Sequence, residues 1–349
     1  MKVLVINGSP RGEKSNSLRL AEAFVKGLGE TETRYFHVAQ KQIAACRGCF
    51  ACWSKTPGKC VIADDAAEAL RDQLWADVIV WSFPLYFYSV PGALKNLIDR
   101  QLPMSLPFMA ERTDGCGNGG HPSRYDVGGK KHVVISTCGF YTAEGNYDGV
   151  CSLFDHMCGA GNYETVFCGE GELFRVPAAK PLTDMYLENV RRGGEEYARD
   201  GRIGPETRAK LSELLLPKEV FEAQANASWG VSPDGQAKAD ETLTFTRQMA
   251  AMYRKESWDG KDRVLEIRYT DRDRAYQLLL GKDGCPVTED CARTPDTVIE
   301  TPWDVWQQVS SGAIRGDEAI MKGLYRIAGD FTLMMRWNEF FGAGGAKQE

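Results

Sequence analysis

The N-terminal half of the chain alternates short apolar runs with segments of helical periodicity. Five apolar runs are predicted to be strands, at residues 2–6, 33–38, 76–82, 131–136 and 163–168. Helical spacing of apolar residues is clearest over 18–28 and 180–199. Strands that alternate with helices are joined by right-handed crossovers and pair in parallel. This half is therefore predicted to be an α/β fold with a five-stranded parallel sheet.

The pattern changes after residue 200. A chain of 349 residues is expected to form about two domains. Residues 201–240 carry several Gly and Pro residues around one helical stretch and are predicted to be a connector. Beyond them a predicted helix precedes grouped strand-like runs, at residues 263–270, 275–280 and 297–301. The sequence thus predicts a first domain over 1–200 and a smaller α+β domain over 241–349.

Charge and hydropathy exclude two classes of protein. A net charge of −6 argues against a nucleic-acid binder, which carries a basic face. No apolar run approaches the ~20 residues of a membrane span. Only four apolar residues, at 3–6, follow Met1 and Lys2. No secretory signal is therefore expected, and the chain is expected to be cytoplasmic.

Cysteine is unusually frequent and is clustered. Nine of the eleven cysteines lie in residues 46–168, although disulfides are rare in the cytoplasm. The sharpest spacing is Cys46-x2-Cys49-x2-Cys52-x7-Cys60. Four thiolates on one loop can ligate a cubane iron–sulfur cluster. Zinc is the weaker alternative, because tetrahedral zinc sites usually combine two separated cysteine pairs.

A polar loop over residues 8–17 joins the first predicted strand to the first predicted helix. Its hydroxyl, amide and guanidinium groups can bind an anion at the helix N-terminus: Ser9, Arg11, Ser15, Asn16 and Ser17. The spacing excludes a nucleotide-hydrolysing P-loop, since no Lys-Ser or Lys-Thr pair follows a Gly-x4-Gly. The alternative is that Ser15 or Ser17 only caps the helix.

A second candidate loop follows the strand predicted at 76–82. It reads Pro84, Leu85, Tyr86, Phe87 and Tyr88. Open α/β sheets bind ligands at the carboxyl ends of their strands, and aromatic side chains there suit a flat ring. A cluster of aromatic residues that packs against a helix is the alternative interpretation.

Three separated motifs resemble the NAD(P)H-dependent FMN reductases, with the iron–sulfur flavoproteins as the nearest branch. They are residues 8–11 with 15–17, residues 84–86, and residues 94–100 (Leu-Lys-Asn-Leu-Ile-Asp-Arg). The resemblance covers about residues 1–200. It implies a doubly wound, flavodoxin-like sheet, bound FMN, NAD(P)H as co-substrate, and homodimers or homotetramers. The redox chemistry would then belong to the flavin, and no side chain is assigned as a catalytic acid or base.

The resemblance also implies roles for the loops. The FMN phosphate would bind to the residues of the 8–17 loop given above. The flavin ring would lie against residues 84–88. A third loop after the fourth strand would flank the flavin with Thr137, Cys138, Gly139 and Phe140.

The cysteine motif matches the compact motif of the iron–sulfur flavoproteins, which implies a [4Fe-4S] cluster on Cys46, Cys49, Cys52 and Cys60. Relatives with a similar pattern followed by Asp-Asp, here Asp64-Asp65, are flavin-only reductases. Both alternatives stay open at the level of the sequence.

The C-terminal segment, about residues 243–341, resembles the sterol-carrier-type lipid-binding domain. The resemblance rests on Trp303-x2-Trp306, Met321-Lys322-Gly323 and Gly329-Asp330, among other positions. It implies an α+β domain around an apolar tunnel that takes an apolar ligand. An ordinary core or a role in oligomerisation is the alternative.

Together these features predict an FMN-dependent NAD(P)H oxidoreductase that passes electrons to a small-molecule or redox-protein acceptor. One alternative is a flavodoxin-like or iron–sulfur electron carrier fed by a protein partner. Another is a lipid- or acyl-binding protein with a vestigial flavin domain.

Overall fold

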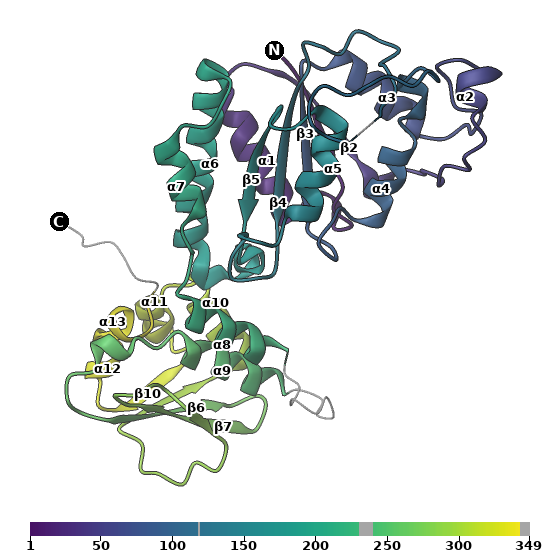
Figure 1. Ribbon diagram of the computed structural model, residues 1–349. Coiled ribbons are helices and arrows are strands. Elements are labelled where there is room, and N and C mark those ends of the chain that lie inside the picture. Colours follow the sequence, from purple (N-terminus) through teal and green to yellow (C-terminus); the bar gives the residue numbers. More distant parts are fainter. Residues whose placement is uncertain (118, 230–239, 343–349) are drawn as a thin grey trace. The chain divides into compact units, whose positions relative to one another are not determined.

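The computed structural model describes residues 1–117, 119–229 and 240–342. These residues divide into two compact units (Figure 1). The first unit comprises Met1–Glu172 and Thr183–Leu215; the second comprises Leu173–Leu182 and the chain from Leu216 onward. The boundaries at residues 200 and 240 stay a prediction, and residues 230–239 of the expected connector lie outside the described residues.

A five-stranded parallel sheet forms the centre of the first unit. Its strands are β1 (Lys2–Asn7), β2 (Glu32–His37), β3 (Val78–Pro84), β4 (Lys131–Thr137) and β5 (Tyr163–Cys168). They pair in the order β2-β1-β3-β4-β5, and every pairing is parallel. This is the flavodoxin-like strand order, so the fold predicted from the sequence is confirmed.

Helices cover both faces of this sheet. On one face lie α3 (Ala66–Trp75), α4 (Gly92–Asp99) and α5 (Asp148–Cys158), whose apolar residues share a core with Trp81 and Phe83. On the other lies α1 (Asn16–Gly27), with apolar residues at helical spacing that are all buried. α6 (Lys180–Asp200) packs against α1, and α7 (Pro205–Ser212) lies beside the edge strand β5.

α1 and α6 cross so closely that only glycine fits at the contact. A Cβ on Gly27 would lie 1.9 Å from the backbone oxygen of Arg191, and one on Gly194 would lie 2.1 Å from that of Phe24. Both obstacles are backbone atoms, which cannot rotate away.

We therefore expect Gly27→Ala to lower the free energy of unfolding by about 3 kcal/mol or more, through overpacking. Thermal unfolding followed by circular dichroism measures the change. Gly129→Ala is the matched control, because a Cβ there meets nothing within 4 Å. Equal melting temperatures for the two variants would contradict the close crossing.

The second unit contains a mixed five-stranded sheet. Its strands are β6 (Arg263–Tyr269), β7 (Arg274–Leu280), β8 (Val287–Thr288), β9 (Thr297–Thr301) and β10 (Arg326–Gly329), in the order β10-β9-β6-β7-β8. Only β6 and β9 pair in parallel. The predicted smaller α+β domain is confirmed, whereas the short strands β8 and β10 were missing from the sequence prediction.

Short helices complete the second unit. They are α8 (Lys218–Ser228), α9 (Glu241–Ala251), α10 (Trp303–Ser310), α11 (Gly316–Met321), α12 (Thr332–Met335) and α13 (Trp337–Phe341). Apolar residues of α9 to α13 form one core with the sheet, which includes Trp306, Tyr269 and Phe340, and α8 packs against α9. None of the helices in the described part of the chain is long and apolar enough to cross a membrane.

Candidate functional site

Three loops meet at the carboxyl edge of the parallel sheet, after β1, β3 and β4. The strand order reverses between β1 and β3, which lie side by side although β2 separates them along the chain. Open α/β sheets bind ligands in the crevice at such a point. These three loops contain all the residues predicted to contact a flavin.

The loop after β1 leads into α1, and its serines are buried at the start of this helix. Ser15 caps the helix, since its Oγ accepts a hydrogen bond of 3.3 Å from the Leu18 amide. The hydroxyl oxygens of Ser15 and Ser17 lie 2.9 Å apart. Ser15 therefore caps the helix, as the alternative interpretation of this loop expected. The cap satisfies only one amide, so other amides of the first turn have no partner within the helix. These amides and the helix dipole favour a phosphate.

Interactions inside the loop hold it in shape. The Asn7 side chain donates to the Gly12 carbonyl oxygen at 2.8 Å and accepts from the Ser9 amide at 3.1 Å. Gly12 has a φ of 57°, which favours glycine. A Cβ on Gly8 would lie 2.5 Å from Leu94. Sequence analysis missed Asn7, whose position at the end of an apolar strand was the available signal.

Two other predicted phosphate residues connect this loop to the segment after β5. Asn16 donates to the Gly171 carbonyl oxygen at 2.7 Å and is buried. Arg11 is half-exposed and lies 3.4 Å from Glu172. The Asn16 amide side chain is therefore engaged within the protein, while the Arg11 guanidinium remains accessible to a ligand. Gly171 and Glu172 were not singled out from the sequence.

The loop after β3 displays aromatic side chains on a strained turn. Tyr86 and Ser89 exchange two backbone hydrogen bonds of 3.0 Å each. Between them Phe87 and Tyr88 have φ values of 46° and 60°. Bulky residues rarely adopt this conformation, and such strain clusters at ligand sites. Phe87 is fully exposed and Tyr86 and Tyr88 are about half-exposed.

The loop after β4 lies directly against the aromatic turn. The Leu85 amide donates a hydrogen bond of 2.8 Å to the backbone carbonyl oxygen of Thr137. The rings of Tyr88 and Phe140 stack with centroids 5.8 Å apart and planes inclined by 16°. Cys138 is buried, and this burial raises the pKa of its thiol. Its side chain thus supports the loop from inside, while Phe140 and Tyr88 provide a flat apolar surface.

The four motif cysteines line one small cavity of about 20 Å³ in the first unit. Their exposure to solvent differs: Cys52 is buried, Cys49 is exposed, and the other two are intermediate. None of the four forms a disulfide. Burial raises the pKa of Cys52, and the neighbouring Cys60 raises it further. Among the described residues, no three His, Cys, Asp or Glu side chains are arranged to hold a metal ion. The thiols share a pocket without converging on one point.

The residues of this pocket nevertheless fit an iron–sulfur cluster in two respects. Four thiols are the donor set that such a cluster takes. In addition, Arg100 lines the same pocket, and its buried Nε has no hydrogen-bond partner within the described part of the chain. A buried N–H beside four sulfur atoms suits an anionic group.

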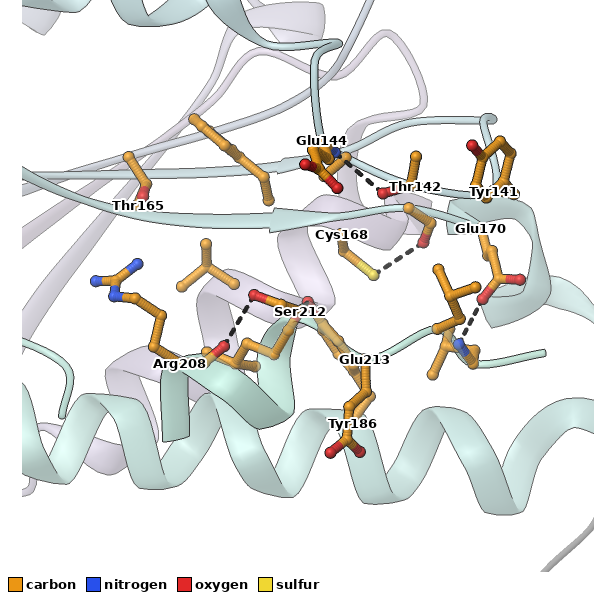
Figure 2. Close-up of a pocket in the computed structure, with 17 residues that line it drawn as sticks. Tyr141, Thr142, Glu144, Thr165, Cys168, Glu170, Tyr186, Arg208, Ser212 and Glu213 are labelled. Carbon is orange, nitrogen blue, oxygen red and sulfur yellow. Dashed lines mark hydrogen bonds between the residues drawn. The ribbon is translucent and has the colours of Figure 1, made fainter. Parts of the chain in front are cut away.

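A separate cavity of about 320 Å³ lies between β5 and α7 (Figure 2). It contains none of the candidate residues of the three loops and the cysteine motif. Its polar groups already bond within the protein: Thr142 accepts from the Glu144 amide, and Glu170 accepts from the Leu215 amide. We interpret it as a packing space between the edge strand and its covering helix.

The second unit contains two apolar cavities of about 570 and 500 Å³. Phe245 and Met249 line the larger one, Phe331 and Met334 line the smaller, and Trp337 borders both. Trp306 also lines the smaller cavity, and its buried indole nitrogen has no partner among the described residues. Such cavities suit an apolar ligand that carries an oxygen acceptor.

His132 is one of the four histidines of the chain and lies in β4. His132 is partly buried and accepts a hydrogen bond of 3.2 Å from the Trp81 indole, and the burial of its ring lowers its pKa to about 4. It is therefore neutral at ordinary pH.

Comparison with known families assigns the two parts of the chain to two different families. Residues 1–170 match the family described as having a flavodoxin-like fold. Residues 228–342 match the SCP-2 sterol transfer family. Both resemblances inferred from the sequence are therefore confirmed.

Individual relatives match the first unit. An iron–sulfur flavoprotein of Methanocaldococcus jannaschii is 38% identical over 201 residues, which is 57% of this chain and 96% of that protein. An iron–sulfur flavoprotein of Archaeoglobus fulgidus is 44% identical over 131 residues, 34% of this chain and 62% of that protein. An FMN-dependent NAD(P)H:quinone oxidoreductase of Pseudomonas aeruginosa is 31% identical over 150 residues, 40% of this chain and 68% of that protein.

Among solved structures, an azoreductase of Bacillus anthracis matches with 19% identity and a TM-score of 0.42. The match covers 56% of this chain and 99% of that one.

Proposed function

The chain belongs to the flavodoxin-like family that includes the iron–sulfur flavoproteins and the FMN-dependent NAD(P)H:quinone oxidoreductases, and we propose that it is itself an FMN-dependent NAD(P)H oxidoreductase. One observation carries the proposal. A helix start suited to phosphate and a strained, exposed aromatic turn lie at the same edge of the sheet. Phosphate and a flat ring are the two ends of FMN.

Each loop has a separate task in this proposal. The first amides of α1 and the Arg11 guanidinium bind the phosphate, while Asn7 keeps the loop in shape. Tyr86, Phe87 and Tyr88 lie against the ring, and Phe140 supports Tyr88 by stacking. FMN held by these residues would supply the redox chemistry, which is the transfer of a hydride and of electrons. The residues of the three loops would orient the ring.

The cysteine pocket adds a second redox group to the proposal. Cys46, Cys49, Cys52 and Cys60 would hold a [4Fe-4S] cluster, which exchanges single electrons. The matches to iron–sulfur flavoproteins support this assignment. The quinone oxidoreductase relatives keep the flavin-only alternative open.

The second unit is proposed to bind a bulky apolar molecule, through Phe245, Met249 and Trp337. In the oxidoreductase this molecule would be the electron acceptor. The same cavities would serve a lipid- or acyl-binding protein, which is the second candidate function. Assembly into homodimers or homotetramers and a cytoplasmic location also remain proposals.

We expect protein purified under anaerobic conditions to contain about one FMN per chain and to oxidise NADH or NADPH when a quinone is supplied. Absorbance spectra and release of the flavin by denaturation measure the first property, and the loss of nicotinamide absorbance measures the second. A flavin that no nicotinamide reduces would favour an electron carrier. A colourless protein that binds fatty acids would favour the lipid-binding alternative.

A further inference from the structure

Arg100 is, with Arg263 of the second unit, one of the two buried arginines of the described residues. Its side chain is 1% exposed, at the end of α4. Nη1 donates to the carbonyl oxygen of Ala44 at 2.9 Å and to Asp64 at 2.7 Å. Nη2 donates to the carbonyl oxygen of Ile62 at 3.2 Å and to Asp64 at 2.8 Å. These four bonds use all the N–H groups of the two terminal nitrogens.

The bonding partners of Arg100 enclose the cysteine motif along the chain. Ala44 precedes Cys46 by two residues, and Ile62 follows Cys60 by two. Asp64 connects to the same segment, because its carboxylate, which accepts from Arg100, also accepts a hydrogen bond of 2.9 Å from the Ala44 amide. One guanidinium therefore ties both ends of the cysteine loop to α4.

The fifth N–H group of the Arg100 guanidinium, at Nε, takes no part in these four hydrogen bonds. It is buried and forms no hydrogen bond of normal geometry with a described residue, although the Cys60 side chain interacts with the guanidinium. The Arg100 side chain lines the cavity of the four thiols. Asp99 is the one acidic residue among the described residues that line this cavity, and its half-exposed carboxylate is paired with Lys95 at 2.6 Å. An unpaired buried N–H is costly, so it indicates a missing acceptor. Apart from the Asp99 carboxylate, the side-chain acceptors that line the cavity are the four cysteine sulfur atoms.

We propose that the Nε of Arg100 donates a hydrogen bond to a sulfur atom of the iron–sulfur cluster, and that Arg100 thereby positions the cluster and raises its reduction potential. The inference rests on the proposed cluster and goes beyond it. Hydrogen bonds to sulfur and net charge both set the potential of such clusters. A buried positive charge favours the more negative, reduced form. Asp64 opposes this effect with its own charge.

Two variants separate this electrostatic role from simple tethering. Arg100→Lys keeps the charge and loses the Nε donor, so the midpoint potential of the cluster falls. Asp64→Asn keeps the donor and removes the opposing charge, so the potential rises. We expect about a tenfold change in the ratio of reduced to oxidised cluster in each case, which is about 59 mV for a one-electron couple. Redox titration of the full-length holoprotein followed by electron paramagnetic resonance measures both shifts.

A double variant guards against loss of folding. A single charge left buried is strongly destabilising, so Arg100→Gln with Asp64→Asn removes both charges together. Its potential should fall as in Arg100→Lys. The midpoint potential of the FMN, which lies on other loops, should stay the same in every variant and serves as the internal control.

The outcomes are distinct. Opposite shifts in Arg100→Lys and Asp64→Asn, with the parental iron content retained, support the inference. Unchanged cluster potentials, or iron that is lost in proportion to thermal stability while the remaining cluster keeps its potential, would show a mere tether and overturn it. A parent protein that holds FMN but no iron would overturn the proposed cluster and this inference with it, and would leave the flavin function standing.

Discussion

Replacing Cys49 by serine is expected to remove the iron from the protein and to leave its FMN in place. The parent, purified without oxygen, should contain about four irons per chain, and the variant fewer than one. A serine hydroxyl is a poor substitute for a soft thiolate ligand. Cys49 is the most exposed of the four cysteines, so its loss costs little packing. Iron analysis and visible spectra measure the result: the broad cluster absorption should disappear while the flavin bands remain.

The matched control for this variant is Cys291→Ser. Cys291 is a partly exposed free thiol of the second unit and does not line the cysteine cavity. The Cys291→Ser variant should retain both iron and flavin. If the parent protein, purified without oxygen, contains flavin but no iron, the cluster assignment is wrong and the protein is a flavin-only reductase. Loss of flavin in Cys49→Ser would mean that the two cofactors are not independent.

The sheet was predictable because its strands carry their own signal. A parallel strand buried on both faces is a continuous apolar run, and β1, β3 and β4 read that way. Helix α6 was equally clear from its periodicity. In contrast, α3 and the short strands β8 and β10 gave no distinct pattern. Two to four residues of strand are fixed by their neighbours in the sheet rather than by their own composition.

The candidate site was predictable only where its residues are contiguous. The loops after β1, β3 and β4 appear in the sequence as short motifs next to strand ends. The partners that shape these loops are distant in the sequence. Gly171, which accepts a hydrogen bond from Asn16, lies 155 residues away from it, and Asp64, which accepts from Arg100, lies 36 residues away. No local pattern encodes such pairs. The left-handed turn at Phe87 and Tyr88 was also hidden, since nothing in aromatic residues suggests that conformation.

The double variant Arg11→Ala with Ser17→Ala is expected to weaken FMN binding by about 100-fold or more. Each hydrogen bond to a charged group contributes about 1.5–3 kcal/mol, and each 1.4 kcal/mol is a tenfold change in affinity. Arg11 is accessible, and its contact with Glu172 is a long surface ion pair of 3.4 Å that a phosphate can readily replace. Fluorescence titration of the flavin-free protein with FMN measures the dissociation constant.

Riboflavin and a neighbouring lysine distinguish phosphate binding from a general disturbance of the loop. Riboflavin lacks the phosphate, so its affinity should be the same in the parent and in the double variant. Lys14→Ala removes another cation of the same loop that has no assigned contact with the phosphate, and it should leave FMN affinity within a few-fold of the parent. If the double variant binds FMN as the parent does, the phosphate lies elsewhere. If it loses riboflavin equally, Ser17 acts through the start of α1, where its hydroxyl lies 2.9 Å from that of the capping residue Ser15.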